Sequence, residues 1–172
     1  MLVLEWAEGG LRVVQELEGE GAATDAAHLL HRNSQDDDQG WHFLVVTSDP
    51  PRAEGFGRIY RWNPLFQRFF LFTDLPAPVA GSLPRATRAR ALTIDDQDFL
   101  AVAARDYLYV YKWQDYGTTE VADNTTARGV GFETFQQIAT NSSVDVDSAC
   151  VAFDETGGCT STQLIVANLG VP

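Results

Sequence analysis

Basic side chains are scarce in this chain of 172 residues. Lysine and arginine together number 12 against 24 aspartates and glutamates, so the formal net charge is −12, and Lys112 is the single lysine. Proteins bind nucleic acid mainly through clustered lysine and arginine side chains that neutralise phosphates. The charge balance therefore argues against nucleic acid as a partner.

Long hydrophobic runs are missing as well. A membrane-spanning helix needs about 18 or more consecutive apolar residues, and no stretch of the chain approaches that length. The first residues, MLVLEWAEGG, contain neither the basic region nor the long apolar segment of a secretion signal. We therefore expect no membrane span and no signal peptide in this sequence.

Cysteine and histidine are also few. The two cysteines, Cys150 and Cys159, lie far from the three histidines, His28, His31 and His42, which argues against a zinc site. The cysteines flank the predicted turn VAFDETGG, so we predict a disulfide bond that closes a hairpin. The alternative is a pair of reduced thiols packed as small apolar groups.

Short alternating runs take the place of long ones. The hydrophobic content is 45% and the aromatic content 11%, as in globular proteins. Runs such as HFLVVT, QRFFLFT and YLYVYKW are aromatic and β-branched, which favours strands. No apolar stripe of helical period is long enough to predict a helix. The sequence therefore predicts an all-β protein.

The strand-like runs repeat along the chain. Trp6, Trp62 and Trp113 each end a run and are separated by 56 and 51 residues. The runs that follow them are expected at 11–17, 66–73 and 132–140, then at 26–30, 89–94 and 146–153, and finally at 43–46, 99–103 and 164–167. Four antiparallel strands in about 50 residues are typical of a propeller blade. We predict a partial β-propeller of about three four-stranded antiparallel blades over 1–172, with repeats at about 1–53, 54–105 and 106–172 and the tryptophans at matching positions.

The order of motifs resembles a known family. The third repeat contains YVYKW, FETFQQIAT, VDVDSACVAF and LIVAN, the second contains RIYRWN and FLAVAA, and the first contains VLEW, LRVVQELEG, ATDAAHLL and FLVV. This order resembles the epilepsy-associated repeat (EAR or EPTP) family. Two features depart from it: Arg88 stands where the other repeats have Asp25 and Asp145, and the second repeat lacks the glutamine found at Gln15 and Gln137.

The resemblance implies a non-catalytic module for protein–protein interaction. Members of the family are secreted or cell-surface proteins with seven-bladed propellers, so the resemblance implies an extracellular location and a protein partner of unknown identity. Because an arc of three blades leaves two sheets uncovered, we interpret the chain as a fragment of a longer ring; the alternative is a protomer that completes a ring with a second copy, although two copies would give six blades rather than the family's seven. Neither His28 nor His31 belongs to a recognisable nucleophile motif, so we expect no enzyme activity and no cofactor. The alternatives are a carbohydrate-binding propeller, with exposed tryptophans stacked on sugar rings, and an accessory domain of an enzyme.

Carboxylates at equivalent places in the repeats are the candidate metal ligands. Asp25 and Asp145 precede the third strand of their repeats, and Asp147 follows two residues later. In a propeller these groups could converge and bind calcium through oxygen ligands, or they could belong to a solvated turn. The acidic clusters at 36–38 and 95–98 lack the spacing of an EF-hand and are interpreted as solvated loops.

Two N-glycosylation sequences occur, at Asn124 in NTT and at Asn141 in NSS. Together with a disulfide bond, they favour an oxidising compartment.

The aromatic strands could form a recognition surface or the blade core. The side chains concerned are Tyr60, Trp62, Tyr107, Tyr109, Tyr111 and Trp113. An arc of three blades leaves two sheet faces without a neighbour, with apolar residues such as Val13, Leu29, Ile138 and Val151 on them. We therefore expect the isolated chain to self-associate.

Overall fold

The computed structural model describes residues 1–18, 22–32, 40–52, 55–76, 85–114, 131–155, 157 and 159–168, and this part of the chain is all-β without a helix. The strands are β1 (Leu2–Ala7), β2 (Gly10–Glu16), β3 (Ala22–His31), β4 (Trp41–Arg52), β5 (Gly55–Asn63), β6 (Arg68–Pro76), β7 (Ala86–Ile94), β8 (Gln97–Ala104), β9 (Tyr107–Gln114), β10 (Gly131–Ala139), β11 (Ser143–Phe153) and β12 (Cys159–Asn168).

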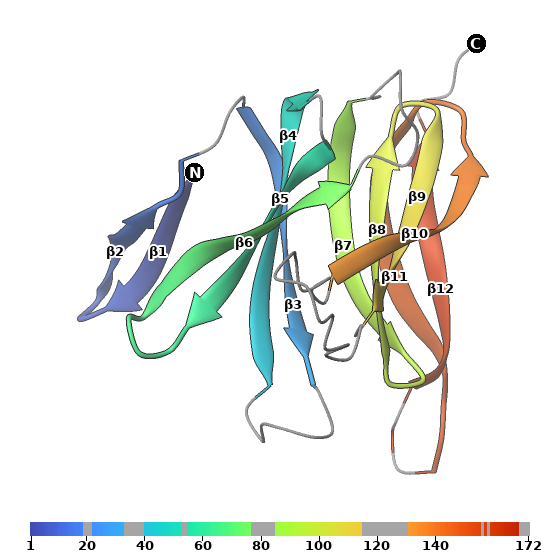
Figure 1. Ribbon diagram of the computed structural model, residues 1–172. Coiled ribbons are helices and arrows are strands. Elements are labelled where there is room, and N and C mark those ends of the chain that lie inside the picture. Colours follow the sequence, from blue (N-terminus) through green and yellow to red (C-terminus); the bar gives the residue numbers. More distant parts are fainter. Residues whose placement is uncertain are drawn as a thin grey trace, which may run out of the picture.

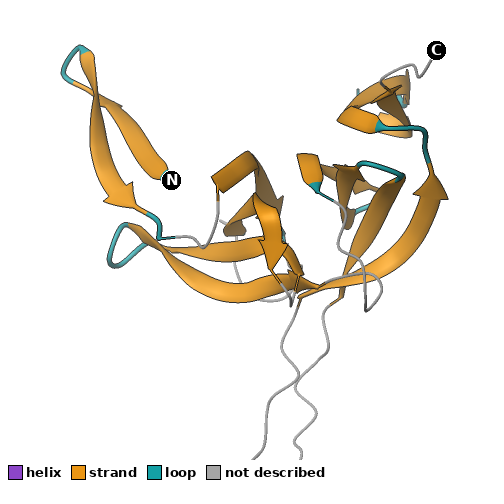
Figure 2. Ribbon diagram, turned by 90° about the horizontal axis from the view of Figure 1, so that it is seen from above, coloured by secondary structure: helices purple, strands orange, loops and turns teal. Residues whose placement is uncertain are grey.

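The strands form four antiparallel sheets that stand side by side (Figure 1). Two are complete, with the strand orders β3-β4-β5-β6 and β7-β8-β9-β10. The other two are hairpins, the N-terminal half-sheet β1-β2 and the C-terminal half-sheet β11-β12. Seen from above, the sheets make an open arc with the half-sheets at its two ends (Figure 2). The described residues do not close into a ring.

The predicted assignment of strands to sheets is wrong: the sequence analysis put β1 to β4, β5 to β8 and β9 to β12 into three sheets, whereas the observed sheet boundaries are shifted by two strands. Each predicted strand region overlaps an observed strand, but the described residues form two four-stranded sheets rather than three. The reason is that the Trp-ended strand is the third strand of a sheet: Trp62 lies in β5 and Trp113 in β9. Each sequence repeat therefore places two strands in one sheet and two in the next.

The strand pairing itself repeats. Trp6, Trp62 and Trp113 pair with Leu11, Phe69 and Phe132, and the register shifts just before Leu4, Tyr60 and Tyr111. In the hairpins β3-β4, β7-β8 and β11-β12 the register shifts just before Asp25, Arg88 and Asp145. A β-bulge bends and twists its strand, so bulges at equivalent places give the sheets the same local shape. This register places Gln136, rather than the predicted Gln137, opposite Val110 and equivalent to Gln15.

Two hairpins close with turns that require positive φ. Glu8 and Gly9 join β1 to β2 with φ of 48° and 85°, and Asp95 and Asp96 join β7 to β8 with φ of 49° and 58°. Positive φ at both central residues is the geometry of the type I′ turn, whose twist matches that of the flanking strands. These short polar turns hold the strand pairs in register.

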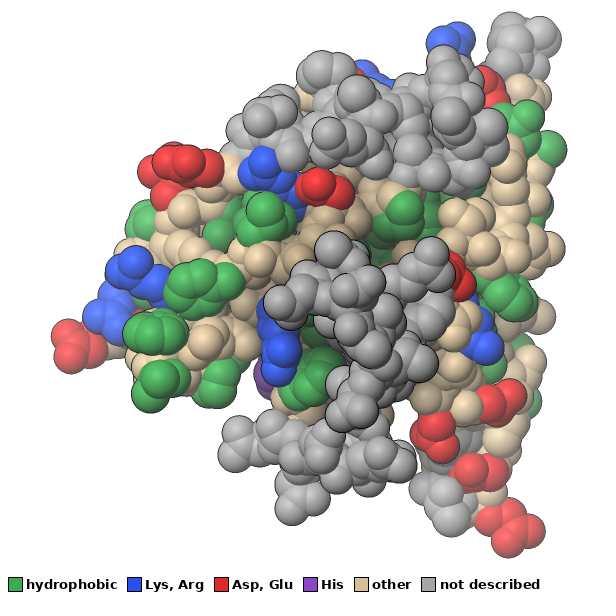
Figure 3. Space-filling view, viewed as in Figure 1, with side chains coloured by type: hydrophobic (Ala, Val, Ile, Leu, Met, Phe, Trp, Pro, Cys, Tyr) green, Lys and Arg blue, Asp and Glu red, His purple; other side chains and the backbone are tan. Residues whose placement is uncertain are grey.

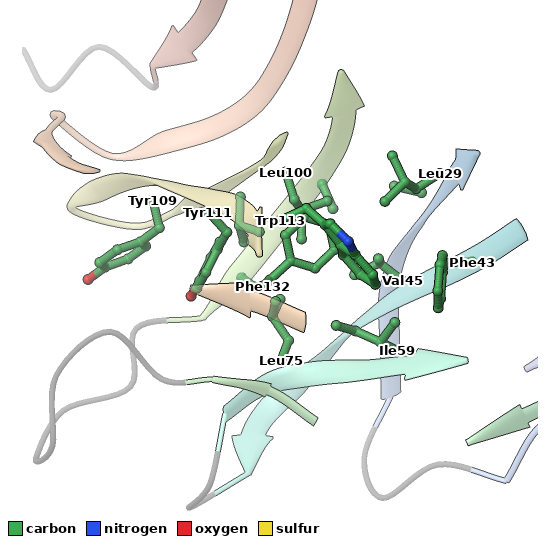
Figure 4. Packing of buried hydrophobic residues seen from close by; sticks show 14 of the residues in the cluster. Leu29, Phe43, Val45, Ile59, Leu75, Leu100, Tyr109, Tyr111, Trp113 and Phe132 are labelled. Atoms are coloured by element: carbon green, nitrogen blue, oxygen red, sulfur yellow. The ribbon is translucent and has the colours of Figure 1, made fainter. Parts of the chain in front are cut away.

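The main core lies between the two complete sheets (Figure 4). Phe43, Val45 and Ile59 from the first complete sheet pack against Leu100, Tyr111 and Trp113 from the second. Trp113 lies at the centre of this core: its ring centroid is 4.8 Å from that of Phe43 and 5.1 Å from that of Phe132. Tyr60, Tyr109, Tyr111 and Trp113 are all buried. Most of the strand aromatics therefore form core rather than a recognition surface.

Burial falls from the middle of the arc to its ends. Trp113 is 2% exposed, whereas Trp6, at the same place in its repeat, is 70% exposed. Val13, Ile138 and Val151 are exposed as predicted, but Leu29 is buried because its side chain points into the main core. The end faces of the arc are thus apolar and open to solvent.

Candidate interaction surface

Arg88 lies between two of the carboxylates that the sequence suggested as metal ligands. Its Nε donates a hydrogen bond to Oδ1 of Asp145 at 2.9 Å, and its Nη1 donates to Oδ1 of Asp25 at 3.3 Å. The second oxygen of Asp25 accepts a hydrogen bond from the backbone N–H of Ala89 at 2.9 Å. Because the three charged residues lie on β3, β7 and β11, this network links three neighbouring sheets.

The ion pair changes the acidity of both partners. The hydrogen bond from Arg88 lowers the pKa of the Asp145 carboxyl below its ordinary value, assisted by the backbone N–H of Val146 and the charge of Arg90. The same contact with Asp145 raises the pKa of Arg88, and the charge of Asp25 adds to this effect. Both groups are therefore charged at neutral pH.

The third candidate ligand, Asp147, also faces an arginine. Arg90 Nε donates to its Oδ1 at 3.2 Å. In the part of the chain that the structure describes, no group of three or more His, Cys, Asp or Glu side chains is placed to hold a metal ion. Arginine already supplies the positive charge beside these carboxylates, so the geometry favours an ion-pair network over a calcium site.

A buried polar cluster joins the two complete sheets at another point. His31 Nδ1 lies 2.6 Å from Oδ2 of Asp98, and the Thr93 hydroxyl donates to Oδ1 of Asp98 at 2.6 Å. His31 and Asp98 are buried, and the His31 ring lies 4.9 Å from that of Trp113. The interpretation of the whole 95–98 cluster as a solvated loop is thus wrong for Asp98, which binds a histidine of the neighbouring sheet.

The histidines contact a carboxylate and one another: His31 binds Asp98, and His28 contacts His42. The Thr93 hydroxyl and the His31 imidazole both bind the Asp98 carboxylate rather than each other. His28 stacks on His42 with 3.0 Å between Nε2 and Nδ1. Partial burial, together with the charge of His42, lowers the pKa of His28. His28 also borders a cleft of about 630 Å³ between β3 and β7, in which Asp96 and Asp98 are the acidic side chains.

A second cleft lies between the N-terminal half-sheet and the β5–β6 hairpin. Its volume is about 580 Å³, and it is lined by Val3, Leu4, Glu5, Arg12, Val13, Val14, Trp62, Phe66, Gln67 and Arg68. We call this the aromatic cleft. Figure 3 shows hydrophobic side chains with arginines among them over β1, β2 and β6. The lining mixes apolar and aromatic side chains with the polar or charged side chains of Glu5, Arg12, Gln67 and Arg68.

The turn between β5 and β6 builds one wall of this cleft. The Asn63 side chain accepts hydrogen bonds from the backbone N–H groups of Leu65 and Phe66, at 3.0 and 3.2 Å. These bonds hold the turn so that Leu65 is 82% exposed and Phe66 stands beside Phe70, with ring centroids 5.9 Å apart. Sequence reasoning missed this patch. The signal was two large apolar residues directly after Asn-Pro, where a turn usually carries polar side chains.

The cysteines form the predicted disulfide bond. Cys150 on β11 and Cys159 on β12 are joined, with their Cα atoms 5.8 Å apart. The bond lies near the end of the C-terminal half-sheet, where the register shifts between Cys150 and Ala152.

The predicted glycosylation site Asn141 lies in the turn between β10 and β11. Asn141 is exposed, whereas Ser143 of the same triplet is buried and its hydroxyl donates to the carbonyl oxygen of Ala104. The other predicted site, Asn124, and the acidic cluster at 36–38 lie outside the described residues. Glycosylation at Asn141 stays a prediction.

Comparison with known proteins gives no family for this chain. No protein-family model matches the sequence, and no curated protein matches it. Within the described ranges, the structure has no helix that is both long and apolar enough to cross a membrane.

Proposed function

We propose that this chain is a non-catalytic protein-interaction module built from EAR-type β-propeller repeats of a secreted or cell-surface protein, and that it forms part of a ring larger than itself. The observation that carries the proposal is the aromatic cleft, with the exposed Phe66 in its lining and the exposed Leu65 next to Phe66 in the same turn. The family resemblance of the repeats supports the same class of function.

The chemistry of the cleft suits an apolar segment of another protein. Trp62 and Phe66 are the aromatic residues of its lining, and aromatic residues and arginine are the usual hot spots of protein interfaces. Arg12 is already paired with Glu5 at 2.7 Å, and Arg68 lines the cleft beside them. We expect the partner to insert an apolar side chain and to place polar groups against this charged rim.

The disulfide bond supports the proposed location. Disulfides persist in oxidising compartments and are rare in the cytosol. The Cys150–Cys159 bond therefore fits an extracellular protein.

Selection from a displayed library of random peptides tests the proposal. We expect selected peptides to bind with an apolar anchor residue, and Phe66→Ala to weaken binding at least about tenfold, as loss of a hot spot does. The matched control is Phe153→Ala, because Phe153 is also exposed but lies at the other end of the arc. Equal losses in both variants, or no selected peptide, would contradict the aromatic cleft as the site.

The carbohydrate alternative rests on one residue. Trp6 exposes 70% of its surface and presents a ring that could stack on a sugar. A glycan array probed with the wild type and with Trp6→Ala separates the two functions. Glycan binding that requires Trp6 would favour a carbohydrate-binding propeller.

A further inference from the structure

Two histidines face each other on neighbouring strands of the first complete sheet. His28 on β3 pairs with Leu44, and His42 on β4 pairs with Leu30. Residues two apart on a strand point to the same face of a sheet, so both imidazoles lie on one face, diagonally across the strand pair. Nε2 of His28 is 3.0 Å from Nδ1 of His42. The sheet thus brings two side chains that commonly bind metals within reach of one ion.

We propose that His28 and His42 together bind a divalent ion of the later first-row transition metals, with Cu²⁺ as the preferred ion. The ligands are Nε2 of His28 and Nδ1 of His42. This site differs from the calcium site considered for the aspartates, because imidazole nitrogen suits copper, nickel and zinc, whereas calcium takes oxygen ligands. The inference goes beyond the proposed function, since neither histidine lines the aromatic cleft.

The distance between the two nitrogens fits two adjacent positions around one ion. An imidazole nitrogen lies about 2.0 to 2.1 Å from a zinc ion, and we take the same length for Cu²⁺. Two such nitrogens are about 2.9 Å apart when they subtend a right angle at the metal and about 3.3 Å apart at the tetrahedral angle. The observed 3.0 Å is close to the right angle. Right angles are the geometry of tetragonal Cu²⁺ and Ni²⁺ sites with nitrogen and oxygen ligands.

In the structure the two rings share a hydrogen bond, and metal binding replaces it. The ring centroids are 5.2 Å apart, so the facing nitrogens lie nearly on the line between the ring centres with one proton between them. For binding, this proton moves to the other nitrogen of the donor ring, and the ion exchanges two of its water ligands for the two lone pairs. Both rings stay neutral. Each ring turns about its Cβ–Cγ bond so that the lone pairs converge, and this torsion is soft in histidine.

The pair is open to solvent, where an ion can reach it. His28 is exposed and His42 is half-buried. His28 also borders the cleft of about 630 Å³ between β3 and β7. Water fills the remaining positions around the ion, as it does at metal sites that protein ligands leave partly open.

The backbone that carries the pair is held from the opposite face of the sheet. Leu29 follows His28, Phe43 follows His42, and both of these apolar side chains are buried in the main core. Strands β3 and β4 stay in register from Asp25 to His31. A pair of ligands fixed in this way loses little entropy when it binds. Both strands belong to a complete sheet, so the geometry of the pair uses neither half-sheet.

His31 gives an internal reference on the same strand. Its Nδ1 lies 2.6 Å from Oδ2 of Asp98, and the side chain is buried. His31 is three residues from His28 and therefore points to the other face of the sheet. We expect it to take no part in metal binding. The chain has three histidines, so each can be followed separately.

The first test is a calorimetric titration of the full chain, without a histidine tag, with Cu²⁺. We expect one ion per chain, bound more tightly than Zn²⁺. His28→Ala and His42→Ala should each weaken binding at least about tenfold, since even the residues behind metal ligands contribute about that much. The control is Asp96→Asn, which removes a carboxylate of the neighbouring cleft and should bind like the wild type. Circular dichroism checks that each variant is folded.

Two outcomes of this titration would overturn the proposal. One is the absence of binding to the wild type. The other is equal affinity in the wild type and both alanine variants, which would show that Cu²⁺ is attracted only by the net charge of −12 or bound elsewhere. Electron paramagnetic resonance of the Cu²⁺ complex should show a tetragonal site with two imidazole nitrogens. A spectrum with no imidazole nitrogen, or with one, would contradict the pair as the ligands.

The second test uses the wild type alone, so it does not depend on the folding of a variant. At saturating Zn²⁺, nitrogen NMR of the imidazoles should show shifts at Nε2 of His28 and Nδ1 of His42, with protons on their other ring nitrogens. The nitrogens of His31 should stay unchanged. Shifts at all three histidines, or at none, would overturn the site. Both tests read metal binding directly, so they are independent of the peptide-binding experiment on Phe66.

Discussion

At the scale of single residues, Arg88 shows how one substitution in a repeat changes its chemistry. The sequence places a carboxylate at this position in the other repeats, at Asp25 and Asp145. Three carboxylates there would repel one another or require a cation. With an arginine in the middle, the same position becomes a salt-bridge network between sheets.

This network predicts a pH dependence. The pKa of Asp145 in the folded protein is below its unfolded value of about 3.9. The ion pair with Arg88 therefore stabilises the fold fully when the pH is above the unfolded pKa, and this stabilisation is lost as the pH falls through the folded pKa. Removal of Arg88 removes the main cause of the shift. We expect NMR titration to show a depressed pKa for Asp145 in the wild type and a higher one in Arg88→Met. An unchanged pKa in the variant would contradict the pairing.

Gly57 is a second residue for which the structure makes a sharp prediction. A Cβ at this position of β5 would lie 1.9 Å from the carbonyl oxygen of Val46 on the neighbouring strand. Backbone must move to make room, so Gly57→Ala should lower the free energy of unfolding by about 3 kcal/mol. Gly131→Ala is the control, since no atom lies within 4 Å of its added Cβ. Urea unfolding of both variants measures the difference, and equal stabilities would count against the close approach of β4 and β5.

At the scale of the elements, the hairpin is the unit that repeats. The hairpins β1-β2, β5-β6 and β9-β10 share a register shift at one equivalent place, and β3-β4, β7-β8 and β11-β12 share one at another. A hairpin with one open edge has fewer neighbours than a complete sheet. The disulfide bond stands in such a hairpin, at the C-terminal end of the arc.

We expect the disulfide to stabilise this hairpin locally. Closing a loop across a sequence separation of 9 residues contributes about 2 to 3 kcal/mol in the chain-entropy model. In Cys150→Ser with Cys159→Ser, the amides of β12 should therefore exchange with deuterium at least about tenfold faster. The amides of β8, in a complete sheet, serve as the internal reference. The same acceleration in β8 and β12 would show a global effect instead of a local one.

At the scale of the whole molecule, the protein is an arc whose middle is buried and whose ends are open. The core between the complete sheets holds the arc together, with Trp113 at its centre and the His31–Asp98 pair at its edge. The two half-sheets carry exposed apolar residues, among them Trp6 and Val151. The stability of the arc should thus depend on residues at the middle far more than on their equivalents at the ends.

Two tryptophans at the same repeat position test this difference. Trp113→Ala should lower the free energy of unfolding by about 3 to 5 kcal/mol, because it leaves a large cavity in the core. Trp6→Ala, measured at a dilution where the chain is monomeric, should change it by less than about 0.5 kcal/mol, as exposed substitutions usually do. Chemical unfolding followed by circular dichroism gives both values. Similar losses at the two positions would mean that the N-terminal half-sheet is covered within a single chain.

The sequence by itself determined the all-β class and the approximate positions of the strands, and it predicted the disulfide bond that the structure contains. These features are local: alternation decides the strands, short polar turns such as Asp95-Asp96 decide the hairpins, and nearby cysteines in one hairpin meet. The tertiary structure decided the rest. Trp6 and Trp113 end similar strands, but only the number of neighbouring sheets makes one exposed and the other buried. Likewise, Asp98 and Arg88 read as ordinary charges until packing brings His31 and the two aspartates to them. The grouping of hairpins into sheets was decided at this level too, because a strand has two edges and its own pattern does not say which neighbour fills each one.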